Sequence, residues 1–326
     1  MMGYWFYKYE VEDRDIGVVD YAQLENAKEI KIPDVTICID FPFHVRNLKA
    51  INSTITIWDY IDYLRGDVYD KMYEEIDYSN VTMDLNKYFK SAWVSWRNGS
   101  STPISSDSIN YIETFNGFSN EYVFIKCFTM RSNVEEQRRV KQVEVNFDSG
   151  KMISDLSNDK CLSLFVHYPN QFFLLKSFES PVFCLKRVWI TYLIIEKLEI
   201  LKQRNSRHRK CSNDIDNYDG NIVNDVLHKT ECHPPYIQSH QSYPKCKTQK
   251  DIKEGIVDIL AQKRVRIPNA CQRISEVRQN IENVGGNFTT WRLQITYPEE
   301  VKIITKSKDV DVHSLIGTLV AILDYF

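Results

Sequence analysis

The segment KCSNDIDNYDGNIVNDVLHKTECHPPYIQSHQSYPKCKTQKDIKEGIVDILAQKRVRIPNACQR, residues 210–273, decides the fold class and the compartment of this chain. Four of its residues are cysteines, and they surround two helical patterns. The first pattern places apolar side chains at helical spacing, at Ile222, Val223, Val226 and Leu227. The second opens at Thr248, with Asp251 three residues on as in a capping box, and continues with Ile252, Ile256, Ile259 and Leu260. The segment therefore predicts two helices joined by a Pro-rich loop.

Two helices flanked by cysteines favour a helical hairpin held by disulfides. The alternative is a zinc site, because cysteine and histidine are the side chains that zinc prefers. The candidate ligands would be His228, Cys232, His233, His240 and Cys246. Adjacent Cys232 and His233 rarely bind one ion, and the following Pro234-Pro235 favours a rigid interhelical loop. We therefore prefer the disulfide interpretation and expect neither a metal nor a cofactor.

The composition describes a folded chain without an obvious catalytic centre. A chain of 326 residues that is 43% hydrophobic and 13% aromatic can bury a large core. Its net charge of −3 gives no overall attraction for nucleic acid. The sequence motifs of serine hydrolases, zinc proteases, P-loop proteins and dinucleotide-binding folds do not occur. We therefore expect that the protein is not an enzyme. His167 lies beside a predicted strand, and we interpret it as a structural residue rather than as a catalytic base or a proton sensor.

Cysteines and glycosylation motifs indicate an oxidising compartment. The chain has eight cysteines, which allow about 105 pairings, so the sequence alone leaves the connectivity open. Four Asn-x-Ser/Thr motifs occur, at Asn52, Asn80, Asn98 and Asn287. Both features favour an extracellular or lumenal location.

Strand patterns outnumber helical patterns along the chain. Residues alternate with a period of two at 35–39, 123–129, 142–147, 162–166, 188–200, 291–297 and 301–305. An amphipathic helix is predicted around Ile57, Ile61 and Leu64, and a surface loop over 98–108. The prediction is an α+β fold, with a mostly antiparallel sheet core and helices at its periphery.

No segment reaches the roughly 18 to 20 apolar residues that cross a bilayer. The longest apolar candidate, at 315–323, ends at Asp324, and residues 1–9 lack the apolar core of a cleavable signal peptide. An extracellular chain without an export signal is a contradiction that composition alone does not resolve.

Four segments, in order, resemble the degenerin/epithelial sodium channel family. Residues 33–38 (PDVTIC) with 41–43 (FPF) resemble the family's FPAVTIC…NPF segment, and 126–130 (KCFTM) resemble its KCYTFN. Residues 165–169 (FVHYP) resemble its VHxP segment. Residues 297–319 resemble the approach to its second membrane helix, which ends in SLIGNxGG. The resemblance spans about residues 5 to 320.

The resemblance implies an ectodomain with a palm sheet and an inner β-ball, surrounded by finger, knuckle and thumb helices. Residues 1–20 would be the remnant of the first membrane helix and the segment after it. The extracellular domain would span 21–310, with the finger at about 49–120 and the thumb at about 210–270, and 311–326 would begin the second membrane helix. The chain would thus be truncated at both membrane helices. The strands near Val35 and Val301 should lie in one sheet, because both would lead to the membrane.

The resemblance also implies three disulfides, Cys38–Cys127, Cys211–Cys271 and Cys232–Cys246. Cys161 and Cys184 remain; they pair by elimination, and two buried free thiols are the alternative. Ser314, Gly317 and Thr318 match gate residues of the family's pore. After them the chain departs from the family pattern, with Val320-Ala321 where the family has Gly-Gly. No motif singles out a proton sensor among Asp70, Glu74, Glu75, Asp251 and Glu254, which lie in the corresponding finger and thumb segments.

The functional expectation is the extracellular portion of a sodium channel subunit. In the family, homotrimers or heterotrimers in the plasma membrane pass Na⁺, and protons, peptides or force gate them. Movement of the thumb and finger would pass through the palm strands to the pore. The alternative is a secreted or surface binding module, derived from the same ectodomain, that does not conduct.

Overall fold

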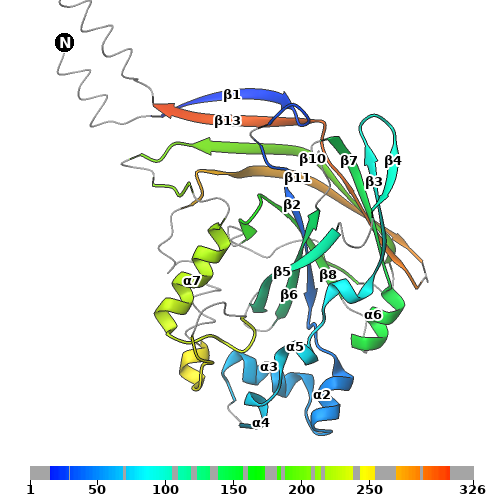
Figure 1. Ribbon diagram of the computed structural model, residues 1–326, viewed down its shortest axis with the longest axis vertical. Helices are drawn as coiled ribbons and strands as arrows, with labels where there is room; N and C mark the ends of the chain where they lie inside the picture. The colour runs from blue at the N-terminus through cyan, green and yellow to red at the C-terminus, as the bar shows by residue number, and fades with distance from the viewer. Residues whose placement is uncertain are drawn as a thin grey trace, which may run out of the picture.

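The computed structural model describes residues 15–28, 30–68, 71–104, 109–118, 123–132, 139–156, 161–172, 182–184, 188–206, 210–213, 217–237, 243–253, 269–286 and 289–308. Within these ranges the chain forms two β-sheets, with short helices gathered mostly at one end (Figure 1).

The first sheet has eight strands. Its order is β1-β13-β10-β12-β7-β3-β4, and β11 also pairs with β10. Its strands are β1 (Asp15–Gln23), β3 (Phe89–Trp96), β4 (Ser101–Ile104), β7 (Val140–Phe147), β10 (Val188–Gln203), β11 (Gln272–Gly285), β12 (Trp291–Thr296) and β13 (Glu300–Lys308). Neighbours are antiparallel except that β10 runs parallel to both β12 and β13.

The sixteen-residue strand β10 pairs first with one parallel strand and then, further along its length, with another. Residues 190–194 pair with 292–296 of β12, and residues 199–203 pair with 302–306 of β13. The break between β12 and β13 is Tyr297-Pro298-Glu299. Proline has no backbone N–H and interrupts a hydrogen-bonded ladder, so Pro298 fits this position. Beyond the break the outer neighbour changes as well, from β7 beside β12 to β1 beside β13.

The second sheet has five strands in the order β5-β6-β2-β8-β9. They are β2 (Asp34–Asp40), β5 (Ile109–Phe118), β6 (Phe124–Ser132), β8 (Cys161–His167) and β9 (Val182–Cys184). Both β2 and β8 are buried over nearly their whole length, as their continuous apolar sequences require.

The helices lie at the periphery of these sheets, mostly at one end, as the sequence predicts for an α+β fold (Figure 1). They are α2 (Val45–Ile51), α3 (Ile57–Arg65), α4 (Lys71–Glu74), α5 (Tyr78–Val81), a 3₁₀ turn (Leu85–Tyr88), α6 (Ser149–Leu156) and α7 (Tyr218–Thr230). The predicted helix around Ile57 is α3, with a capping box between Thr56 and Asp59 and a left-handed Gly66 at its end. In the second predicted hairpin helix, Thr248 Oγ1 accepts from Asp251 N at 3.1 Å. Residues 249–253 are helical, and the rest of that helix lies outside the described residues.

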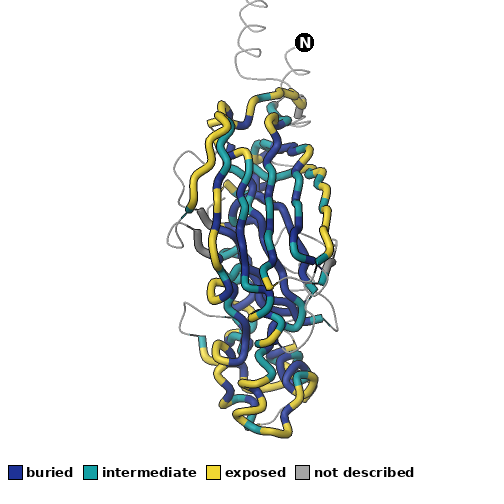
Figure 2. Tube along the Cα trace, turned by 90° about the vertical axis from the view of Figure 1, so that its right-hand side faces the viewer, coloured by how far each residue is buried: buried dark blue, intermediate teal, exposed yellow. Residues whose placement is uncertain are grey.

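The two sheets share the largest apolar core. Its buried members include Ile37 and Leu164 from the second sheet and Leu293 from the first. Fully buried Trp291 stacks on Phe147, with ring centroids 5.1 Å apart. Figure 2 shows the buried positions concentrated along the strands in the middle of the molecule. A separate aromatic-rich cluster holds α2 to α5 together.

One topological prediction is wrong. The strand at 35–39 is part of β2 in the second sheet, whereas the strand at 301–305 is part of β13 in the first. The antiparallel partner of β13 is β1, whose nine residues pair from Asp15 with Lys308 to Gln23 with Glu300. Alternation identifies a strand but not its partner, and mostly exposed β1 gives no apolar pattern. The expected boundary at residue 20 falls inside β1, and the loop expected over 98–108 contains β4.

Candidate functional site

The three disulfides that the resemblance implies are present, Cys161 is bonded to Cys184, and no cysteine is free. Cys38–Cys127 joins directly opposed residues of β2 and β6, and Cys161–Cys184 does the same for β8 and β9. Both have Cα atoms 4.0 Å apart, somewhat closer than the about 4.5 Å of non-hydrogen-bonded pairs in antiparallel strands. The second sheet is therefore cross-linked at two places, and the free-thiol alternative for Cys161 and Cys184 is wrong.

The Cys211–Cys271 disulfide ties together the two ends of the segment that contains α7. Cys211 follows β10, and Cys271 directly precedes β11. Backbone bonds reinforce this base: Gln203 N donates to Cys271 O at 2.7 Å, and Cys271 N donates to Ser212 O at 2.8 Å. The segment thus leaves the first sheet and returns to it at one anchored point.

The Cys232–Cys246 disulfide lies at the far end of α7. Both sulfurs are bonded to each other, so neither is a thiolate for the alternative zinc site; His240 lies outside the described residues. The described ranges contain no cluster of three metal-ligating side chains. Buried Tyr236 follows the disulfide and packs edge-on against Phe124, with ring centroids 5.4 Å apart. The disulfide tip therefore rests on the aromatic cluster of α2 to α5.

A second contact joins the α3 end to the start of the next hairpin helix. Lys253 Nζ lies 2.8 Å from Asp67 Oδ1, and Gln249 Nε2 donates to Asp67 O at 2.8 Å. A Cβ on Gly66 would come within 2.8 Å of Gln249 O, so only glycine permits this approach. Burial opposes ionisation, but Lys253 and Arg65 outweigh it and lower the pKa of Asp67.

The carboxylate at this contact differs from those that the sequence singled out. Asp70 and Glu254 lie outside the described residues. Glu74, Glu75 and Asp251 are described, but the ion pair between the two segments uses Asp67. Sequence reasoning missed Asp67 because nothing at residue 67 marks a partner almost two hundred positions away.

A buried carboxylate links β13 to the rest of the first sheet. Glu199 of β10 is 7% exposed, and its two oxygens bind Lys302 Nζ at 2.7 Å and Ser275 Oγ at 2.8 Å. The hydrogen bond from Lys302, together with that from Ser275, lowers the pKa of Glu199 despite its burial. Three strands, β10, β11 and β13, therefore meet at this one side chain.

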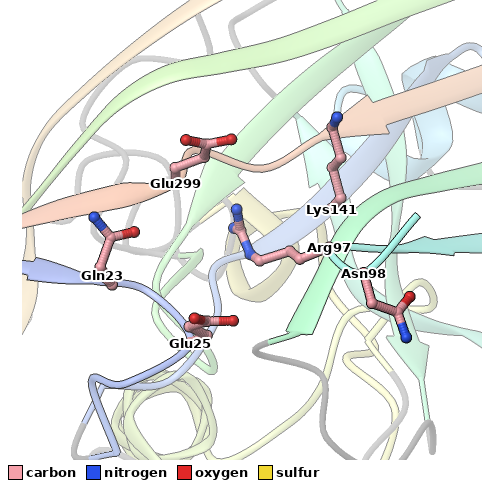
Figure 3. Close-up of a pocket in the computed structure, with 6 residues that line it drawn as sticks. All are labelled: Gln23, Glu25, Arg97, Asn98, Lys141 and Glu299. Carbon is pink, nitrogen blue, oxygen red and sulfur yellow. The ribbon is translucent and has the colours of Figure 1, made fainter. Parts of the chain in front are cut away.

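A polar groove opens at the break between β12 and β13 (Figure 3). One part, of about 390 Å³, is lined by Gln23, Glu25, Arg97, Asn98, Lys141 and Glu299. An adjoining part, of about 610 Å³, shares Glu25, Arg97 and Asn98 and adds Asn26, Lys28, Trp96, Ser100 and Arg139. The lining comes from four chain reversals and strand ends that are far apart in sequence. No sequence motif predicts this groove.

A buried histidine and a buried lysine belong to the second sheet. His167 is 3% exposed; its Nε2 lies 2.7 Å from Thr36 Oγ1, and its Nδ1 lies 2.9 Å from Tyr168 O. This satisfied environment agrees with a structural histidine. Lys126 is 5% exposed and forms an ion pair with Glu113 at 2.9 Å.

The predicted glycosylation sites fall on the surface where they are described. Asn80 and Asn98 are exposed and Asn52 is partly exposed. Asn98 occupies the tip of the β3–β4 hairpin, where Ser100 N and Oγ donate to its Oδ1 at 3.0 and 2.7 Å. Asn287 and the gate-like Ser314, Gly317 and Thr318 lie outside the described residues.

Comparison with known proteins gives no assignment: no family model matches the chain, and no curated protein matches it either. None of the helices in the described ranges is both long and apolar enough to cross a membrane.

Proposed function

We propose that the chain is the extracellular portion of a subunit of a degenerin/epithelial sodium channel-type sodium channel. One observation carries this proposal: β1 and β13 pair along their whole length, with Asp15 opposite Lys308. The two ends of the described domain therefore leave side by side at one end of the first sheet (Figure 1). A domain suspended between two membrane helices needs this arrangement.

The remaining features can be assigned within this proposal. The first sheet is the palm and the second sheet is the β-ball. Helices α2 to α5 belong to the finger, and the segment 210–270, anchored by Cys211–Cys271, is the thumb. Four cross-linked pairs of cysteines in the expected order support this reading.

The contacts provide a route from the helices to the two chain ends. A stimulus that changes the Asp67–Lys253 contact moves the thumb relative to the finger. The thumb base at Cys211–Cys271 lies between β10 and β11, and Glu199 of β10 holds Lys302 of β13. Displacement of the thumb is then passed to β13, beyond which lie the gate-like residues. Two-state movement of packed elements is the general mechanism of such coupling.

The subunit would assemble into a homotrimer or heterotrimer in the plasma membrane, with Na⁺ as the permeant ion. We expect no current from the 326-residue chain alone, because its longest apolar stretch is too short to cross a bilayer.

The test is voltage clamp of oocytes that express the chain extended by the coding sequence on both of its sides. The expected result is an amiloride-sensitive Na⁺ current. Asp67→Lys and Lys253→Asp should each change how the current depends on the stimulus, and the variant that carries both changes should restore that dependence. The exposed control Glu75→Gln should leave the stimulus dependence of the current unchanged.

Two results would reject the channel. The first is that the flanking sequence encodes no apolar helix and the chain is secreted into the medium. That result would support the non-conducting binding module. The second is surface-expressed protein that carries no current alone or with related subunits.

A further inference from the structure

The polar groove at the break in the first sheet has the construction of a ligand site. Its two parts, of about 390 and 610 Å³, share Glu25, Arg97 and Asn98 and so lie next to each other. These volumes lie within the range of about 300–1,000 Å³ that is typical of small-molecule sites.

Charges of both signs line the groove, among them those of Glu25, Arg97, Lys141 and Glu299. The carboxylates of Glu25 and Glu299 flank the Arg97 guanidinium in Figure 3. The described residues nevertheless contain no ion pair from Arg97 to either carboxylate, and none that involves Lys141. Arg97 Nη2 donates to Pro298 O at 2.6 Å, whereas its buried Nε–H has no acceptor among the described residues.

A guanidinium that donates on one side and keeps an unpaired N–H on another suits a carboxylate. The Nε–H and an Nη–H of arginine form a fork that matches two carboxylate oxygens. The two free glutamates suit an ammonium group in the same way. Glu25 and Glu299 would repel a simple anion, and Arg97 and Lys141 would repel a simple cation. A molecule that carries both charges meets an opposite charge at each end.

The walls of the groove are held in place before any ligand arrives. Leu24 N donates to Glu299 O at 2.8 Å, Tyr297 N donates to Lys141 O at 3.0 Å, and Arg97 N donates to Arg139 O at 2.9 Å. Preorganised groups lose little freedom on binding, which favours affinity. The Asn98 amide points away from Arg97 in Figure 3, so a glycan on it would leave the groove open.

We propose that this groove binds a small zwitterion of the α-amino acid class, with its carboxylate on Arg97 and its ammonium group beside the carboxylates of Glu25 and Glu299. The site joins the end of β1 and the β12–β13 break to the β3–β4 hairpin and the start of β7. Binding therefore stabilises the first sheet where it changes partners. The proposal stands whether or not the chain belongs to a channel.

Isothermal titration of the purified, disulfide-bonded chain tests this with three matched probes. L-Phenylalanine carries both charges, 3-phenylpropanoate carries only the carboxylate, and 2-phenylethylamine carries only the ammonium group. Phenylalanine is expected to bind, and each single-charge compound is expected to bind at least tenfold more weakly. Absence of binding by phenylalanine, or equal binding of either single-charge compound, would overturn the proposal.

Charge-neutralising variants locate the site. Glu25→Gln and Lys141→Gln remove charges whose side chains have no ion pair among the described residues, so folding should be preserved. Glu25→Gln is expected to weaken phenylalanine binding at least tenfold, and Lys141→Gln to weaken it less. Glu75→Gln, among the helices at the opposite end of the molecule, is the matched control. An unchanged affinity in folded Glu25→Gln would also overturn the proposal.

Discussion

Replacing Glu113 by glutamine should destabilise the protein more than removing its buried partner Lys126. Lys126 is almost fully buried, whereas the Glu113 side chain is 26% exposed. Lys126 Nζ lies 2.9 Å from Glu113 Oε2 and donates to Thr82 Oγ1 at 3.2 Å. It also lies over the rings of Tyr78 and Phe128, at 5.6 and 5.5 Å from their centroids.

The asymmetry follows from which charge is left behind. Glu113→Gln leaves an ammonium ion in the interior without a counter-ion, a change that costs about 3–5 kcal/mol in buried pairs. We expect about 3 kcal/mol, because Thr82 and the two rings still contact the cation. Lys126→Met keeps an apolar chain of similar length and leaves a carboxylate that water reaches. Its expected cost is about 1 kcal/mol, the net value of a hydrogen bond.

Urea unfolding at pH 7, followed by the fluorescence of the six tryptophans, measures both changes. The double variant Glu113→Gln with Lys126→Met should lose at most about 1 kcal/mol more unfolding free energy than Lys126→Met alone, because no unpaired cation remains. Disulfide content must be the same in all variants. Equal or greater destabilisation by Lys126→Met would refute the reasoning about the buried cation.

Replacing Cys232 and Cys246 by alanine should lower the free energy of unfolding by about 3 kcal/mol, the chain-entropy value for a loop of this size; a urea midpoint equal to the parent's would contradict it. Stability should fall as pH decreases below the ordinary pKa of Glu199, near 4.5, because the native pKa is lower and protonation removes its hydrogen bonds. Glu199→Gln should flatten this pH dependence in urea titrations, and an unaltered slope would count against it. Thr191→Val should cost about 1–3 kcal/mol, because Trp291 Nε1 loses its acceptor at 3.0 Å; thermal unfolding that matches the parent would disprove this.

The sequence predicts local structure well wherever burial imposes a period. Strands such as β2 and β8, and helix α3 with its capping residues, follow from apolar spacing and end signals. The sequence does not predict strand β11, because its residues are exposed or partly exposed and neither face of the strand is continuously apolar. Strand β1 escapes for a related reason: Val18, Val19 and Tyr21 are all at least 46% exposed.

Long-range partners are harder to predict than the elements themselves. Three of the disulfides follow from a resemblance and the fourth from elimination, since spacing alone leaves every pairing open. The Asp67–Lys253 and Glu199–Lys302 pairs each join residues more than one hundred positions apart. The groove at Pro298 depends on the meeting of four chain segments, around residues 23–28, 96–100, 139–141 and 299. Only the three-dimensional structure brings these charges together.

The β1–β13 ladder determines how the domain responds when its two ends are drawn apart. Since both ends leave at the Asp15–Lys308 rung, tension falls on that rung first rather than on all nine pairs together. The ladder then unzips one rung at a time towards Gln23 and Glu300. On its other edge β13 runs parallel to β10, and there the same pull acts along the strands and shears several bonds at once. The domain thus yields first between β1 and β13, while β13 stays attached to β10.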